Sequence, residues 1–274
     1  MKILDYARLD TEVAASRSAF AAGSVFPYIV LDDFLSPDAA NALLEEFGER
    51  NENWTAYNHY NERKAGLTHM ELMGPQTREI VQELSSKRFL GWMEQVSGIT
   101  GLLADPDLDG GGLHSIKRGG FLNLHVDFKS HTTRRSWSRQ LNLLLYLNKE
   151  WQDDWEGFLE LWDRDVERCV ERIKPIFNRC VLFQTSSENS YHGHPTPLAC
   201  PEDVSRKSLA LYYFRDEGEA LKLAPTHYRA RPDEPIWKHA LVAADRAALR
   251  VYSLLKRCTP IDDKLVSRML RRYE

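Results

Sequence analysis

The chain has 274 residues, 43% of them hydrophobic and 28% charged, and a formal net charge of −4 at pH 7. This length and composition are typical of a globular protein that can bury a core. The negative charge gives no electrostatic basis for binding nucleic acid. No apolar run is long enough to cross a membrane, and the N-terminus lacks the apolar segment of a secretory signal. We expect a cytoplasmic protein with reduced thiols, because its four cysteines contain no Cys-x-x-Cys pair.

Residues 1–111 are expected to form a strand and supporting helices. The aromatic and β-branched stretch 26–34 predicts a strand, and Ser36-Pro37 then supply an N-cap and a first-turn proline for a helix. Helices are also predicted over 9–22, 75–84 and 87–96, the last two from apolar residues at helical spacing. Residues 50–70 are polar and aromatic without a clear period, and we expect them mainly to pack on the sheet.

Residues 112–216 change to short apolar runs separated by turn signals, which predicts an antiparallel sandwich or barrel. The predicted strands are 113–117, 121–128, 140–147, 157–162, 175–177, 180–184 and 208–214. Residues 217–274 become helical again, with candidates at 236–257 and 264–271. Apolar residues at heptad-like spacing from Leu241 to Leu255 fit either docking on the barrel or a homodimer. We expect all three regions to form one structural domain.

Two histidines and one aspartate in the β region suggest a metal site. His125 and Asp127 lie two residues apart on a predicted strand, so both side chains point to the same face. His192 follows in the sequence His192-Gly193-His194, where His194 is the alternative ligand on the same face. Two imidazoles and one carboxylate on one side of a metal leave three coordination positions open, as in non-haem iron(II) oxygenases.

A second group of polar residues suggests a carboxylate-binding pocket. Arg206 and Ser208 share one face of a predicted strand, so a guanidinium and a hydroxyl can bind one carboxylate. Lys207 competes with Arg206 as the anchor, but alternation sends it to the opposite face. Tyr146 ends a strand with one leucine face and one partly polar face, which fits a lined cavity.

These residues, in this order, resemble the iron(II)- and 2-oxoglutarate-dependent dioxygenases of the prolyl 4-hydroxylase-like group. The resemblance covers residues 112–214 and includes Arg139, the segments 146–151 and 157–162, and the segment 173–183. It implies a mainly β fold with flanking helices: a double-stranded β-helix (jelly-roll, cupin-like) core with N-terminal supporting helices and C-terminal helices. Within the resemblance, the pattern His-Gly-x-Pro favours His192 over His194 as the ligand.

The resemblance also implies roles and cofactors. His125, Asp127 and His192 would bind iron(II), Arg206 and Tyr146 would bind the distal carboxylate of 2-oxoglutarate, and O2 would be the second co-substrate. Ascorbate is compatible with this chemistry. Ser208 is added from strand geometry rather than from the family. The expected reaction is hydroxylation of an unactivated carbon, with a prolyl residue of a protein or peptide as the best-known target of the group.

Several alternatives remain at this stage. A small-molecule hydroxylase acting on amino acids, sugars or natural products uses the same scaffold, because fold does not determine function. A catalytically silent barrel predicts loss of the metal ligands or the anchor, whereas both are present. A cupin-like metalloprotein favours a His-x-His strand and gives no reason for Arg206. The basic loop 129–137 is either a solvated hairpin loop or a lid over the substrate.

Overall fold

The computed structural model describes residues 1–185, 189–222, 226–242 and 244. Contacts divide the chain into two compact units, residues 1–227 and 228–274. In the second unit residues 236–242 are helical, as the sequence predicts. The rest of that helix, the helix predicted at 264–271 and most of the heptad-like stretch lie outside the described residues. The domain limits at 111 and 216 and the homodimer stay predictions. None of the helices in the described ranges combines the length and apolar character needed to cross a bilayer.

The first unit consists of helices followed by many short strands. The α-helices are α1 (Tyr6–Ala21), α2 (Pro37–Phe47), α3 (Pro75–Leu84) and α4 (Lys87–Ser97), with 3-10 turns at Met70–Leu72 and Asp153–Trp155. The strands are β1 (Tyr28–Leu31), β2 (Thr55–His59), β3 (Glu62–Leu67), β4 (Leu103–Ala104), β5 (Gly112–Lys117), β6 (Phe121–Val126), β7 (Trp137–Tyr146), β8 (Leu159–Trp162), β9 (Cys169–Ile173), β10 (Cys180–Gln184), β11 (His192–His194), β12 (Ser205–Asp216) and β13 (His227–Tyr228).

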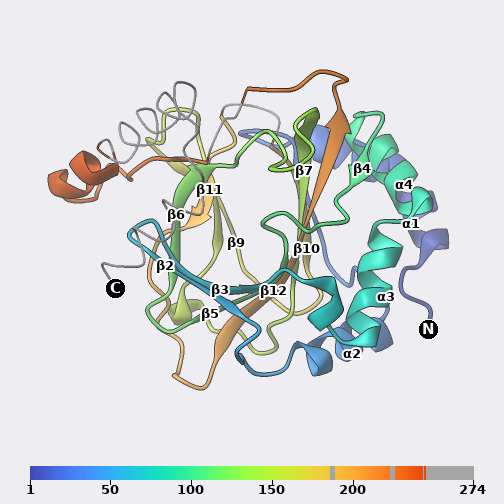
Figure 1. The fold of residues 1–274 in the computed structure, drawn as a ribbon, viewed down its shortest axis with the longest axis horizontal. Coiled ribbons are helices and arrows are strands. Elements are labelled where there is room, and N and C mark those ends of the chain that lie inside the picture. Colours follow the sequence, from blue (N-terminus) through green and yellow to red (C-terminus); the bar gives the residue numbers. More distant parts are fainter. Residues whose placement is uncertain (186–188, 223–225, 243, 245–274) are drawn as a thin grey trace. The chain divides into compact units, whose positions relative to one another are not determined.

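The strands form a curled antiparallel sheet with two facing halves (Figure 1). One half has the order β1-β10-β7-β12-β5, and the other has the order β6-β11-β8-β9. Strand β3 pairs with both β5 and β6 and so joins the two halves. This arrangement is the predicted double-stranded β-helix core, and it turns one face of every strand toward a common interior.

The helices cover the outer face of the half that contains β7 and β12 (Figure 1). Alternate leucines of β7, from Leu141 to Leu147, pack with Leu43 of α2 and Ile80 of α3 in one buried cluster. Each buried leucine contributes about 1.5–3 kcal/mol through removal of apolar surface from water. The helix beginning predicted at Ser36 is confirmed, because the Ser36 hydroxyl accepts a hydrogen bond from the Ala39 N–H at 3.3 Å.

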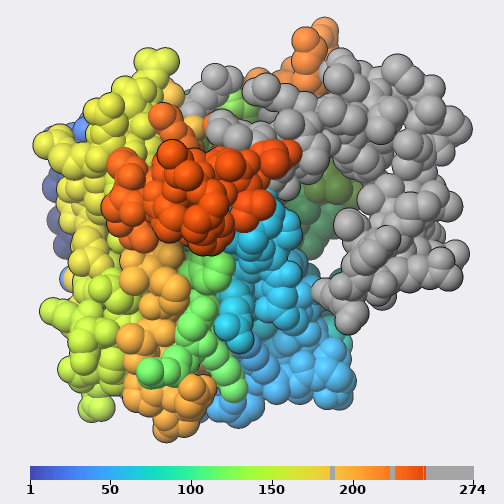
Figure 2. Space-filling model, turned by 90° about the vertical axis from the view of Figure 1, so that its left-hand side faces the viewer, coloured from blue at the N-terminus to red at the C-terminus, as the bar shows by residue number. Residues whose placement is uncertain are grey.

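Several strands differ from the sequence prediction. Residues 55–67 form the hairpin β2–β3 rather than irregular packing, and this hairpin lies beside the β5–β6 segment on the surface (Figure 2). The strand predicted at 175–177 is wrong, and β9, which ends two residues earlier, pairs with β8 instead. His192 lies on the short strand β11, which the sequence does not predict. Polar residues occupy the beginning of β3 and both ends of β11, so neither strand shows apolar alternation.

Candidate active site

Strands β6 and β11 bring the predicted triad together inside the barrel. His192 is the direct cross-strand partner of His125, and the two ring centroids lie 4.5 Å apart. Asp127 follows the end of β6, with its Oδ1 3.5 Å from His125 Nε2 and its Oδ2 3.4 Å from His192 Nε2. All three donor atoms lie within 4.8 Å of one another, which is compatible with one metal ion.

The hydrogen bonds of the two histidines fit a metal between them. Nδ1 of His125 contacts the Asn123 carbonyl and Nδ1 of His192 contacts the Ser190 carbonyl, each at 2.9 Å. A carbonyl only accepts, so each Nδ1 donates to its carbonyl and each Nε2 is turned toward Asp127. Two imidazole nitrogens and a carboxylate facing one another can hold a cation. This donor set, oriented by backbone carbonyls, is typical of sites for iron(II) and similar ions.

The surroundings of Asp127 keep its carboxylate ionised. Burial opposes ionisation, but the neighbouring groups, of which Arg139 has the largest effect through its charge, outweigh it and hold the pKa of Asp127 well below its ordinary value. Arg139 Nη2 lies 3.4 Å from Asp127 Oδ2, and Asn142 donates a hydrogen bond to the same oxygen at 2.8 Å. Burial lowers the pKa of His192 to about 4, so its ring stays neutral and able to bind a metal at neutral pH.

Arg206 and Tyr146 form the predicted pocket on β12 and β7. The Arg206 Nη2 group donates to the Tyr146 hydroxyl at 3.2 Å, and its Nε donates to the Gly157 carbonyl at 2.7 Å. Arg206 is 4% exposed, and within the described ranges no carboxylate forms an ion pair with it. Burial lowers its pKa, since no neighbouring anion compensates the lost hydration. A buried guanidinium without a carboxylate fits an anionic ligand, as 2-oxoglutarate requires.

The neighbours of Arg206 also follow the predicted alternation. Ser208 is buried on the same face and pairs across the sheet with Tyr146. Lys207 points to the opposite face, where its amine lies 6.0 Å from the Phe47 ring centroid. The geometry thus separates Lys207 from the pocket. The assignment of His125, Asp127 and His192 to metal and of Arg206, Tyr146 and Ser208 to co-substrate remains a prediction about role.

Two further histidines lie inside the barrel. His114 on β5 and His194 on β11 are 7% and 4% exposed, and each has a ring nitrogen without a hydrogen-bond partner in the described part of the chain. The sequence pattern did not indicate a role for His114. A signal was present, because His114 and the apolar Ile116 lie two residues apart on one predicted strand and so share a face. His194, the alternative ligand in the sequence, lies on β11 two residues after His192.

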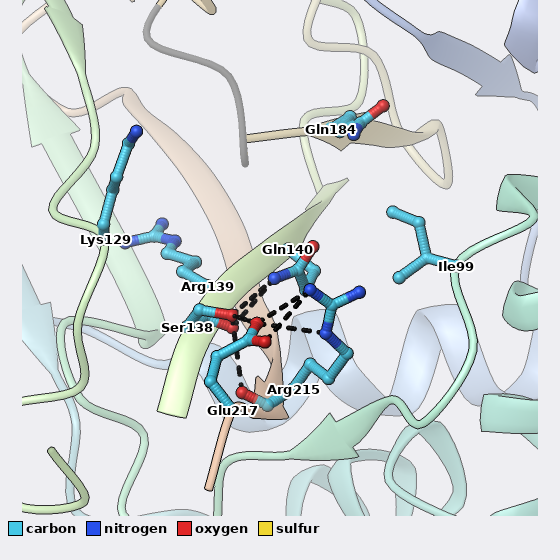
Figure 3. Close-up of a pocket in the computed structure, with 8 residues that line it drawn as sticks. All are labelled: Ile99, Lys129, Ser138, Arg139, Gln140, Gln184, Arg215 and Glu217. Atoms are coloured by element: carbon cyan, nitrogen blue, oxygen red, sulfur yellow. Dashed lines mark hydrogen bonds and ion pairs between the residues drawn. The ribbon is translucent and has the colours of Figure 1, made fainter. Parts of the chain in front are cut away.

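A cavity of about 410 Å³ extends along the beginning of β7 and the end of β12 (Figure 3). It is lined by Ile99, Lys129, Ser138, Arg139, Gln140, Gln184, Arg215 and Glu217. Arg139 lines this cavity and also lies 3.4 Å from Asp127, whereas the lining includes none of His125, Asp127 and His192. Arg215 and Glu217 form an ion pair at 2.8 Å on its wall. The lining is polar, with three basic side chains and one acidic side chain.

The loop 129–137 is tied to a second acidic cluster. His131 is fully buried, and its Nε2 lies 3.0 Å from Asp105 Oδ1. Its Nδ1 accepts N–H groups of Thr133 and Arg134, and Arg134 forms an ion pair with Asp107. Although Asp105, Asp107 and His131 could surround a metal, their donors and charges are already paired within the protein. These contacts fix the loop at its base.

Comparisons with known proteins agree with this geometry. Residues 111–229 match the profile of the 2OG-Fe(II) oxygenase superfamily. The prolyl 3-hydroxylase OGFOD1 of Mus musculus is 25% identical over 173 residues, which are 62% of this chain and 28% of the mouse protein. This chain therefore matches less than a third of that relative's length.

Solved structures show the same fold. A prolyl-4-hydroxylase of Pseudomonas putida aligns with a TM-score of 0.54 and 16% identity, over 73% of this chain and 98% of the other. A prolyl hydroxylase of Trichoplax adhaerens, solved with a peptide fragment of hypoxia inducible factor, aligns with a TM-score of 0.52 and 19% identity, over 78% and 94%. Residues 111–229 are therefore similar to the 2OG-Fe(II) oxygenase superfamily, and the fold is similar to that of these two prolyl hydroxylases.

Proposed function

We propose that this protein is an iron(II)- and 2-oxoglutarate-dependent dioxygenase that hydroxylates an unactivated carbon of its substrate. The observation that supports this most is the pairing of two sites inside one barrel. A triad with two inward-facing Nε2 atoms and one carboxylate can hold a cation. A buried guanidinium, hydrogen-bonded to a tyrosine, requires an anion.

The proposed chemistry assigns a distinct task to each group of residues. His125, Asp127 and His192 would hold iron(II), which with 2-oxoglutarate activates O2 for oxidation of a C–H bond, with succinate and carbon dioxide as the other products. Arg206 would orient the co-substrate through its distal carboxylate, with the hydroxyls of Tyr146 and Ser208 as further donors. Arg139 would balance the charge of Asp127 and fix its carboxylate toward the two imidazoles.

The proposed substrate is a prolyl residue in a peptide or protein. This follows from the names of the relatives, which are prolyl hydroxylases, one of them solved with a bound peptide. The cavity lined by Arg139 supports the proposal, because its volume of about 410 Å³ can hold side chains of a peptide, and Arg139 also pairs with Asp127 of the triad. Its amide, lysine and arginine side chains can bind peptide carbonyls.

The first test is an anaerobic titration of the protein with iron(II) and then with 2-oxoglutarate, followed by visible absorption. We expect a charge-transfer band that needs both additions and is lost in Asp127→Ala, with the far-UV circular dichroism unchanged. Incubation of the loaded enzyme with proline-containing peptides should then give a mass increase of one oxygen atom. Absence of the band in the wild-type protein would contradict the proposed activity. A band without peptide oxidation, but with oxidation of a free amino acid or sugar, would identify a small-molecule hydroxylase instead.

A further inference from the structure

The interior of the barrel contains a basic residue that the proposed chemistry does not use. His114 is 7% exposed and points inward from β5, and its Nε2 has no hydrogen-bond partner among the residues described. Burying a polar nitrogen without a partner is costly, so such atoms usually face a ligand or an ordered water. The register of β5 in the sheet places His114 beside the proposed co-substrate pocket.

His114 lies on the same rung of the sheet as two residues of the co-substrate pocket. Ser208 is the cross-strand partner both of His114 and of Tyr146, so three inward side chains lie in a row across β5, β12 and β7. Arg206 pairs with Ile116, two residues further along β5, and is therefore the diagonal neighbour of His114. On the other side of His114, the partner is Gly66, where a Cβ would lie 3.2 Å from the Tyr57 ring and 3.7 Å from the His114 ring.

The tautomer of His114 follows from its backbone contacts. The carbonyl groups of Gly110 and Gly111 interact with the ring and favour a proton on it. The nitrogen without a partner, Nε2, then presents a lone pair to the pocket in the neutral ring. Burial, and after it the charge of Lys64, lowers the pKa of His114 to about 3, so the free protein holds this ring neutral.

A carboxylate beside this nitrogen favours protonation of the His114 ring. Oxygen lone pairs of the ligand and the Nε2 lone pair would repel each other in a pocket without water, unless one proton lies between them. The dianion also cancels the basic charges that keep the ring neutral in the free protein. The titratable groups around the ring are Tyr57 on β2, Lys64 on β3, Tyr146 on β7, His194 on β11 and Arg206 on β12.

We propose that His114 is a positioning residue of the co-substrate pocket, and that its Nε2 shares one proton with the carboxylate held by Arg206, so that the dicarboxylate binds together with a proton from solvent. The inference rests on the proposed function, because it takes 2-oxoglutarate as the ligand. It makes the affinity for the co-substrate depend on pH, because the complex takes up a proton and the proton concentration falls as the pH rises. The co-substrate then binds more weakly in alkaline than in mildly acidic solution.

The test is calorimetric titration of the manganese(II)-loaded protein with 2-oxoglutarate in buffers of different ionisation enthalpy. Loading the metal first separates the protons released by its ligands from those taken up with the co-substrate. At pH 6–7 free carboxylates are ionised, so any proton taken up goes to the complex. We expect uptake of about one proton and an affinity that falls about tenfold per pH unit, as one linked proton requires. The variant His114→Gln should bind without proton uptake and with an affinity independent of pH.

A matched substitution, His69→Gln, changes a histidine with an exposed side chain and should keep the full proton uptake. Binding by the wild-type protein without proton uptake would overturn the inference and leave the proposed function intact. Uptake that persists in His114→Gln would overturn it as well, because the proton would then belong to another group. No binding of 2-oxoglutarate by the wild-type protein at any pH would instead contradict the proposed function.

Discussion

Replacing Arg206 with methionine should affect stability and ligand binding in very different ways. Methionine keeps much of the apolar volume of the arginine stem and removes the charge. The variant loses the hydrogen bond to the Gly157 carbonyl, which costs about 1–3 kcal/mol if that carbonyl stays unpaired. It also removes a buried cation that has no carboxylate partner in the free protein, which relieves a desolvation cost of several kcal/mol.

These two terms have opposite signs, so the free energy of unfolding of the ligand-free protein should change by less than about 2 kcal/mol. The affinity for the co-substrate should fall strongly, because the distal carboxylate of 2-oxoglutarate would be buried without its charged partner. Loss of one partner of a buried ion pair costs about 3–5 kcal/mol, or roughly 100- to 5,000-fold in affinity. Affinity for the metal should stay the same, because in the described part of the chain Arg206 forms no hydrogen bond or ion pair with the three proposed ligands.

The assay combines urea unfolding of the ligand-free protein with calorimetric titration of 2-oxoglutarate into the manganese(II)-loaded protein. The control is Lys207→Met, one residue further along β12, whose side chain lies toward Phe47 and should not affect the co-substrate. Unchanged affinity in Arg206→Met would refute the anchor. A loss of more than about 3 kcal/mol of stability in the ligand-free variant would show instead that Arg206 is needed for folding.

Three further predictions test the supports of the site. Gly157→Ala places a Cβ 3.1 Å from the Arg206 side chain at a φ of +75°, and should weaken 2-oxoglutarate binding about tenfold at a cost of about 1–3 kcal/mol in stability; unchanged binding would contradict this. Burial raises the pKa of Glu46, but hydrogen bonds from backbone N–H groups of α3 outweigh it and lower this pKa. Glu46→Gln should therefore reduce the free energy of unfolding by about 1 kcal/mol at pH 7. In urea unfolding this difference from the wild-type protein should disappear as the pH falls below about 4.5. His131→Ala leaves Asp105 buried without its partner and should cost about 3 kcal/mol in thermal unfolding, whereas a loss below 1 kcal/mol would show that the loop is held elsewhere.

The parts of the site that the sequence predicted depend on local geometry. Alternation along one strand places Arg206 and Ser208 together and sends Lys207 away, and this needs no knowledge of the partner strands. The same rule directs His125 and Asp127 to one side. The leucine face of β7 was predicted for the same reason, because its apolar residues contact helices while the opposite face lines the interior.

The parts that the sequence did not predict depend on distant partners. Strand β3 contains Glu62, Arg63 and Lys64 in succession, and it forms a strand because β2 pairs along its length while β6 and β5 pair with its first and last residues. A polar interior also removes the apolar alternation by which a strand is normally predicted. The contact of His131 with Asp105 joins residues 26 positions apart, and no local pattern indicates it.

The distribution of charge in the barrel explains why both ligands belong to one site. Without ligands, Arg139 is paired with Asp127 and Lys64 with Glu62, whereas Arg206 has no carboxylate partner among the described residues. Burial, followed by the charges of Arg206 and Lys64, lowers the pKa of His194 well below its ordinary value. A divalent metal alone would add positive charge to this interior. A dianion that reaches from the triad to Arg206 neutralises both ends at once, so the metal and the co-substrate should each strengthen the binding of the other. A monocarboxylate of the same length can satisfy only one end, and it should bind at least tenfold more weakly, because one charged group stays buried and unpaired.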